Sequence, residues 1–165
     1  MIMSTKTKED SSKVPSASSQ EKVDAQFMQK ALVEAQIAFE ADEVPVGAVI
    51  VCQGRIIARA HNLTETLNDP TAHAEMQAIT SATSLLGGKY LQECTLYVTV
   101  EPCVMCAGAL GWAQISRVVY GCDDEKRGFS RYAPEALHPK TEVTPHILEK
   151  ECKDLMQSFF KNKRK

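Results

Sequence analysis

The chain has 165 residues, 44% of them hydrophobic, which is enough for one compact domain with its own core. Its formal net charge of −2 excludes an overall basic field that would attract nucleic acid, so a nucleic-acid partner would need a local basic patch. No apolar stretch approaches the about 18 residues of a membrane span, and the first residues lack the apolar core of a secretory signal. We therefore expect a cytoplasmic protein with no membrane partner.

The N-terminal half of the sequence predicts a tail followed by an ordered domain. Residues 1–20 are rich in Ser, Lys and acidic residues, so we expect a disordered N-terminal tail there and one folded domain over residues 21–165. Hydrophobic residues at helical spacing predict a first helix from residue 21 to about residue 41. The next predicted elements are two strands joined as a hairpin and a helix, at 45–52, 55–60 and 72–86.

The C-terminal half alternates strands with helices. Residues 94–100 form the clearest predicted strand, Pro102 ends it, and a helix is expected over residues 103–113. Residues 122–140 are polar and interrupted by prolines, so we expect mostly loop with one helical turn. The remaining predicted elements are two short strands and a last helix, at 117–120, 142–144 and 145–160. This alternation predicts a layered α/β domain with a mixed sheet.

A Cys-x-x-Cys pair and an upstream histidine form a candidate metal site. Cys103 and Cys106 open a predicted helix, so both sulfurs share one face, and the helix N-terminus lowers a thiol pKa toward the thiolate that binds metals. His73 stands at the start of the preceding helix. One imidazole and two thiolates leave a fourth position of a tetrahedral zinc ion for water. This is a catalytic arrangement, in which the pKa of the bound water falls to about 7.

Two other interpretations of this cluster remain open at this point. A redox dithiol would use the cysteine pair alone and would not need the histidine. A structural zinc site would need a fourth protein ligand, for which the candidates are His61, Cys94 and Cys122. We favour the catalytic interpretation, because none of these three candidates belongs to a second close pair of ligands.

Glu75 follows the histidine by two residues. A carboxylate beside metal-bound water can take its proton and pass it to a substrate, which is general acid–base catalysis. An exposed helix glutamate is the ordinary alternative, but a metal ligand two positions earlier disfavours it. On a regular helix, however, two residues at this spacing point about 200° apart. His73 and Glu75 can therefore face one site only if the histidine lies at an irregular helix end.

The sequence resembles a known family. The paired motifs His73-Ala74-Glu75 and Pro102-Cys103-Val104-Met105-Cys106 resemble those of the cytidine-deaminase superfamily. Flanking residues are most similar to the bacterial tRNA-specific adenosine deaminases, and the similar stretches are 43–48, 68–75, 101–108 and 117–121. The resemblance extends from about residue 27 to the C-terminus.

The resemblance implies a three-layer α/β fold in which helices flank a mixed five-stranded sheet. It implies conversion of adenosine to inosine at the tRNA anticodon wobble position, one zinc ion per subunit, and a homodimer whose subunits both shape the substrate groove. Matched to the family's motifs, His73, Cys103 and Cys106 bind zinc and Glu75 is the proton shuttle. The implied substrate contacts are Asn62, Val46 and Ala74. From the residues alone, the asparagine has a turn residue as its alternative, over which we favour the substrate contact, and the valine is equally strand core.

The sequence indicates the substrate less clearly than it indicates the type of reaction. Residues 128–137 are shorter than the corresponding stretch of the tRNA enzymes and differ from it, which bears on RNA recognition. Basic residues offer phosphate contacts or simply complement a helix dipole; they are Lys126, Arg127, Arg131, Lys161, Lys163, Arg164 and Lys165. The first alternative is a deaminase of a free base or nucleoside such as guanine, which the 68–75 stretch and Trp112 also fit. The second is a zinc-stabilised scaffold without activity, which Glu75 disfavours.

Overall fold

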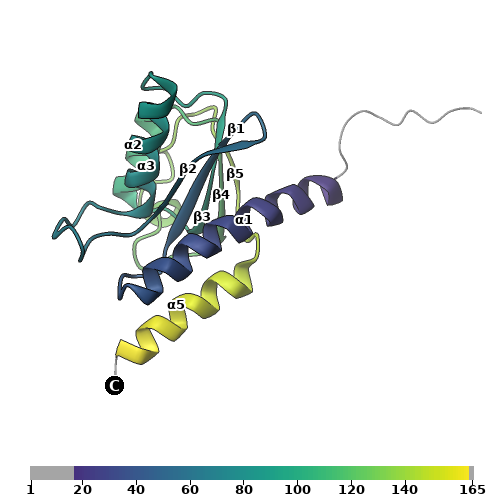
Figure 1. The fold of residues 1–165 in the computed structure, drawn as a ribbon. Helices are drawn as coiled ribbons and strands as arrows, with labels where there is room; N and C mark the ends of the chain where they lie inside the picture. Colours follow the sequence, from purple (N-terminus) through teal and green to yellow (C-terminus); the bar gives the residue numbers. More distant parts are fainter. Residues whose placement is uncertain (1–16, 164–165) are drawn as a thin grey trace, which may run out of the picture.

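The computed structural model describes residues 17–163, which fold around one five-stranded sheet (Figure 1). The strands are β1 (Gly47–Cys52), β2 (Arg55–His61), β3 (Cys94–Val100), β4 (Arg117–Cys122) and β5 (Glu142–Thr144). The helices are α1 (Ala17–Glu40), α2 (Ala74–Leu86), α3 (Val104–Ala113), α4 (Phe129–Tyr132) and α5 (Glu149–Lys163). Every predicted element is present, and the expected α/β class with a mixed five-stranded sheet is confirmed.

The sheet is antiparallel in one half and parallel in the other. Its order is β2-β1-β3-β4-β5, with β2, β1 and β3 antiparallel and β3, β4 and β5 parallel. The β1–β2 hairpin turns at Gln53 and Gly54, whose φ values of 53° and 77° suit the right-handed twist of the strands. Parallel strands need a crossover connection, and α3 supplies it between β3 and β4. This crossover begins with the cysteine motif, at the carboxyl end of β3.

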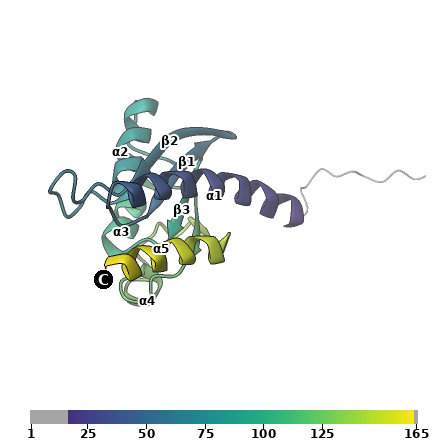
Figure 2. The ribbon, with the colours of Figure 1, turned by 60° about the horizontal axis from the view of Figure 1, so that its bottom comes forward.

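Helices cover both faces of the sheet. In both views α1 and α5 lie side by side on one face, while α2 and α3 pack together on the other (Figures 1 and 2). Every residue of β3 except Thr95 is buried, as expected for a strand covered on two faces. The helix α1 approaches β1 closely at Gly47, where a Cβ atom would lie 2.0 Å from the Ala31 carbonyl oxygen. The expected three-layer arrangement is therefore confirmed.

A buried ion pair fastens α1 to the sheet. The Asp24 carboxylate, 1% exposed, accepts hydrogen bonds from the Arg117 guanidinium at 2.8 and 2.7 Å and from the Tyr97 hydroxyl at 2.9 Å. Burial acts to raise the pKa of Asp24, but the hydrogen bonds from Arg117 and Tyr97 outweigh it and lower that pKa below its usual value. Arg117 also donates to Thr144 Oγ1 at 2.9 Å. One guanidinium thus joins α1 to β4 and β5.

The first helix begins earlier than its sequence predicts. It starts at Ala17 and not at residue 21, and within it the Gln20 side-chain amide donates to Asp24 Oδ1 at 3.1 Å. The predicted tail, residues 1–20, thus overlaps the first four residues of this helix. Residues 1–16, the rest of the predicted tail, lie outside the described residues.

The last helix begins later than its sequence predicts. It starts at Glu149 and not at Pro145, because His146 and Leu148 adopt φ values of 68° and 56°, which a right-handed helix does not contain. It continues to Lys163. Among residues 17–163, none of the helices combines the length and the apolar character that crossing a membrane requires.

Candidate metal centre and active site

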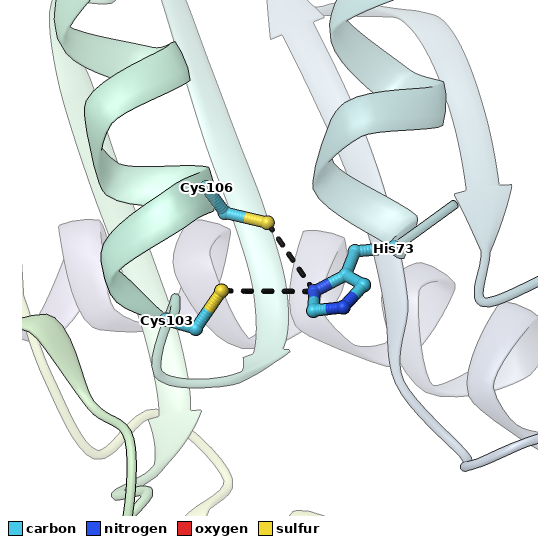
Figure 3. A group of neighbouring side chains, drawn as sticks. All are labelled: His73, Cys103 and Cys106. Atoms are coloured by element: carbon cyan, nitrogen blue, oxygen red, sulfur yellow. Dashed lines mark hydrogen bonds between the residues drawn. The ribbon is translucent and has the colours of Figure 1, made fainter. Parts of the chain in front are cut away.

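Three side chains from the N-termini of two helices converge (Figure 3). His73 is the N-terminal cap residue of α2, Cys103 is the cap residue of α3, and Cys106 lies in the first turn of α3. His73 Nδ1 lies 3.7 Å from Cys103 Sγ and 3.5 Å from Cys106 Sγ. One ligand atom from each residue lies within 4.8 Å of the other two. The fold thus brings the three predicted ligands into one group.

The cap position of His73 explains how it and Glu75 face one site. His73 has φ −75° and ψ 156°, which is extended, so α2 begins at Ala74 and not at the predicted residue 72. The separation of about 200° that a regular helix imposes does not apply, because only Glu75 is helical. The Glu75 side chain is buried, hydrogen-bonds with Cys106 and interacts with the charges of Cys103 and His73.

Protons are distributed unequally within this group. Hydrogen bonds from Cys106 and His73 lower the pKa of Cys103 to about 4. The hydrogen bond with Cys103, together with burial, raises the pKa of Cys106, so the first thiolate forms on Cys103. Burial raises the pKa of Glu75 to about 7. A bound cation would displace the thiol protons, because metals bind the thiolate form.

The donor set fits zinc, which prefers nitrogen and sulfur ligands. The imidazole also hydrogen-bonds to the backbone of Pro70, which orients the ring while Nδ1 faces the two sulfurs. Among residues 17–163 the group has three candidate ligands and no fourth. His61 instead contacts Glu34 Oε1 at 2.8 Å, and neither Cys94 nor Cys122 joins the group. This arrangement suits a catalytic site with an open position better than a closed structural site.

Hydrogen bonds link the three predicted substrate contacts to one another. The Asn62 N–H donates to the Val46 carbonyl at 3.2 Å, and Asn62 Oδ1 accepts the Ala74 N–H at 2.8 Å. Val46 and Asn62 are largely buried, at 9% and 7% exposure, so Asn62 is not a solvent-exposed turn residue. Ala74 directly follows His73, so this hydrogen-bonded chain ends at a residue next to the metal group. Asn62 also holds the first turn of α2 in place.

The loop between β2 and α2 closes on itself just before His73. The Leu63 N–H donates to the Ala72 carbonyl at 2.9 Å. An open cleft of about 520 Å³ runs along this loop, and its lining residues are Thr64, Glu65, Asn68, Asp69 and Pro70. Since Pro70 hydrogen-bonds to the histidine, this cleft lies beside the metal group.

Two fully or almost fully buried glutamates, Glu43 and Glu101, were not singled out from the sequence. Glu43 accepts hydrogen bonds from the Thr66 N–H and hydroxyl, both at 2.6 Å, from the Glu65 N–H at 3.0 Å and from the Thr64 hydroxyl at 3.4 Å. Burial acts to raise the pKa of Glu43, but these bonds outweigh it and lower that pKa. Their position in the sequence could have indicated them, because each glutamate is the first residue of a stretch that carries the family resemblance.

The basic residues that are candidates for phosphate contacts lie in two separate regions. Lys126, Arg127 and Arg131 are exposed in the segment after β4. Lys161 and Lys163 are exposed at the end of α5, where the Lys163 ammonium forms an ion pair with Asp42 at 2.8 Å. Arg164 and Lys165 lie outside the described residues.

Comparisons with known proteins agree with the geometry. Residues 22–164 match the family model of MafB19-like deaminase. The chain is 45% identical over 143 residues to the tRNA-specific adenosine deaminase of Agrobacterium fabrum. The matched stretch covers 84% of this chain and 94% of that protein. A solved structure from work on A-to-I editing by tRNA:A34 deaminases at the wobble position matches with a TM-score of 0.74 at 45% identity, over 79% of this chain and 98% of that one.

A solved guanine deaminase from Bacillus subtilis matches less completely, with a TM-score of 0.57 at 44% identity, over 59% of this chain and 63% of that one. Of these three relatives, the two that are matched over at least 94% of their own length are tRNA deaminases, and all three are deaminases. The chain therefore belongs to the MafB19-like deaminase family, within the cytidine-deaminase superfamily that its paired motifs resemble.

Proposed function

We propose that this protein deaminates adenosine to inosine at the wobble position of a tRNA anticodon. The observation that carries the proposal is the group of His73, Cys103 and Cys106 with Glu75 buried beside it. The tRNA-specific relatives combine 45% identity with a match over 94% and 98% of their length, whereas the guanine deaminase of similar identity is matched over only 63%, which favours tRNA over a free base. A tRNA substrate also supports action in the cytoplasm.

We infer that His73, Cys103 and Cys106 hold one zinc ion per subunit. Their mutual distances and the imidazole–thiol donor set support this. When bound by three protein ligands, zinc lowers the pKa of a water molecule at its fourth position to about 7. The catalytic domain is proposed to span residues 21–165, which the family match over residues 22–164 supports.

Glu75 is proposed to carry the proton. Deamination replaces the C6 amino group of adenine by oxygen from water and releases ammonia. Protons must therefore move from the water to ring N1 and then to the departing nitrogen. One carboxyl group, fixed in the first turn of α2 beside the metal group, can accept a proton and donate it again.

We further propose that Asn62, Val46 and Ala74 form one wall of the pocket for the target base. Their hydrogen-bonded chain next to His73 supports this. A base that is stacked or paired in RNA does not reach such a site, so the target nucleotide must be splayed out of its loop. The polar cleft of about 520 Å³ along the β2–α2 loop offers room for the neighbouring nucleotides.

We infer a homodimer that covers the outer face of α3. Apart from one cysteine, this helix consists only of apolar residues and glycine, yet Val104 and Trp112 on it are 42% and 86% exposed. A helix that is apolar on all sides is normally buried. Light scattering should therefore show a dimer that Trp112→Glu converts to a monomer. Val33→Glu, on the opposite face of the sheet, should leave the dimer intact.

An assay of two substrates tests the function. The protein is incubated with an anticodon stem-loop RNA that contains a wobble adenosine and, separately, with guanine, and the released ammonia and the inosine are measured. Ammonia from guanine alone would refute the tRNA substrate. In Glu75→Gln we expect one zinc ion to be retained and turnover to fall by about 10²–10⁴-fold, the usual contribution of a general acid–base residue.

Glu93→Gln is the matched control for that variant, because Glu93 is exposed at the opposite end of β3. It should deaminate the stem-loop at the wild-type rate. Full activity of Glu75→Gln would contradict the proposed proton transfer, whatever the substrate.

A further inference from the structure

The segment of residues 124–130, called the clamp segment below, lies against the turn that carries the first cysteine. The Phe129 N–H donates to the Pro102 carbonyl at 3.0 Å, and Cys103 forms an isolated antiparallel bridge with Gly128. A proposed metal ligand and the clamp segment are therefore in direct backbone contact. Lys126 and Arg127 are exposed on this segment, so their charges are available to a ligand.

Glu101 ties both ends of the clamp segment to this turn. It directly precedes Pro102, and it is 4% exposed. Glu101 Oε1 accepts the Asp124 N–H at 3.0 Å, and Oε2 accepts the Ser130 N–H at 3.0 Å and the Ser130 hydroxyl at 2.5 Å. One carboxylate thus bonds to the first and the last residue of the segment.

The charge of Glu101 is compensated by these donors. Among residues 17–163 it forms no ion pair with a lysine, an arginine or a histidine. A buried carboxylate is costly unless such donors satisfy it, and buried N–H groups are costly without an acceptor. The position of the clamp segment and the burial of this carboxylate therefore depend on each other.

The side chain of Glu101 is also packed closely against Gly128. A Cβ atom on Gly128 would lie 2.4 Å from Glu101 Cδ and 2.4 Å from Oε1. The φ of Gly128 is −61°, which any residue adopts, so the close approach of the carboxylate is what requires glycine here. The clamp segment has no room to shift toward Glu101.

We propose that Glu101 is a positioning residue that holds the clamp segment beside the metal centre, so that Lys126 and Arg127 contact backbone phosphates of the RNA substrate. This inference rests on the proposed function. Lysine and arginine contacts to phosphates fix the register of a nucleic acid, and they make its binding depend on salt. Among residues 17–163 the hydrogen bonds of the Glu101 side chain go to Asp124 and Ser130 and not to His73, Cys103 or Cys106, so we expect its loss to act on the placement of the RNA.

The test variant is Glu101→Gln, which places an amide NH₂ among N–H donors and so repels the clamp segment. We expect KM for the anticodon stem-loop to rise about tenfold, while kcat changes less than about threefold and one zinc ion is retained. The slope of log KM against log salt concentration should become shallower by about 1, because a phosphate contact is lost. Hydrogen exchange at the Asp124 and Ser130 amides should accelerate.

A second variant reaches the same contact without changing a charge. Gly128→Ala puts a methyl group against the Glu101 carboxylate, and we expect the same rise in KM and the same faster exchange. The controls are Glu93→Gln, on an exposed glutamate, and Gly88→Ala, on a glycine with open space around it. Both controls should retain the wild-type KM and salt dependence.

The outcomes separate this inference from the proposed function. A wild-type protein that does not deaminate the stem-loop refutes the proposed function, whereas amide exchange in Glu101→Gln is measured without any substrate. If the wild type is active and both variants keep its KM, salt slope and amide protection, Glu101 does not position the RNA. If Glu101→Gln does not fold, Gly128→Ala carries the test, and its wild-type KM would overturn the inference.

Discussion

Two loops flank the metal group, and each is held by a buried glutamate that has no basic partner among residues 17–163. Glu43 holds the loop between β2 and α2, and Glu101 holds the clamp segment after β4. The difference lies in what each loop carries. The first ends at His73, a proposed metal ligand, whereas the second carries exposed basic residues. We therefore expect these similar contacts to serve two different tasks: the first places a metal ligand and the second places the substrate.

A buried carboxylate is well suited to holding a loop of this kind. A glutamate that accepts several N–H and O–H bonds organises the backbone of a loop that has no regular hydrogen-bonding partner of its own. Because each glutamate bonds to one loop only, breaking these bonds should disorder that loop and leave the sheet intact. Variants of the two glutamates should therefore differ in which property of the protein they change.

The largest difference is expected from Glu43→Gln. The amide would face the N–H groups of Glu65 and Thr66, so the loop that ends at His73 would lose its order. We expect the dissociation constant for zinc to rise by about 10–100-fold, as for residues that orient metal ligands. A competition titration against a chromophoric chelator measures it. Glu101→Gln should retain the wild-type zinc affinity in the same titration.

Glu93→Gln again supplies the matched control for this titration and should bind zinc like the wild type. Equal effects of Glu43→Gln and Glu101→Gln on zinc affinity would show that the two loops do not have separate tasks. An unchanged affinity in Glu43→Gln would show that His73 is held without its loop.

At another buried carboxylate, Asp24, we expect a smaller effect on function but a larger effect on stability. It is paired with the Arg117 guanidinium and anchors α1, far along the chain from both loops. Asp24→Asn should lower the free energy of unfolding by about 3 kcal/mol, because it leaves a largely buried guanidinium without its charge partner. Zinc affinity and KM at 25 °C should stay unchanged. Asp154→Asn, in an exposed ion pair on α5, should cost less than about 1 kcal/mol.

The contribution of Asp24 to the free energy of unfolding should also depend on pH in a defined direction. Its pKa is lower in the folded protein than the value of 3.8 that it has when unfolded. Its ionised form thus stabilises the fold fully above that value, and this stabilisation is lost as the pH falls through the folded pKa. Urea unfolding of the wild type and Asp24→Asn should give a constant difference above about pH 5 and a shrinking one below about pH 4. A difference that grew toward acid would contradict this assignment.

The order of the elements was predictable from the sequence, while some of their ends were not. Strand β3 is an apolar run that Pro102 ends, and both signals are local. The start of α5 depends on positive φ values at His146 and Leu148, two residues with no strong preference for that conformation. Between these two residues, the Ile147 N–H donates to the Tyr120 carbonyl on β4 at 3.1 Å, which holds the backbone in this conformation. Such a contact has no counterpart in the local sequence.

The proposed chemistry of the site could be predicted from the amino-acid sequence, because Cys103, Cys106, His73 and Glu75 stand in short motifs whose spacing is set by a helix terminus. How these motifs come together depends on the packing of the whole domain. It placed His73 in an extended cap, which lets the imidazole and the Glu75 carboxyl face one point. It also gave Glu101 its partners, 23 and 29 residues away along the chain. Contacts over such separations arise from packing, and no local propensity encodes them.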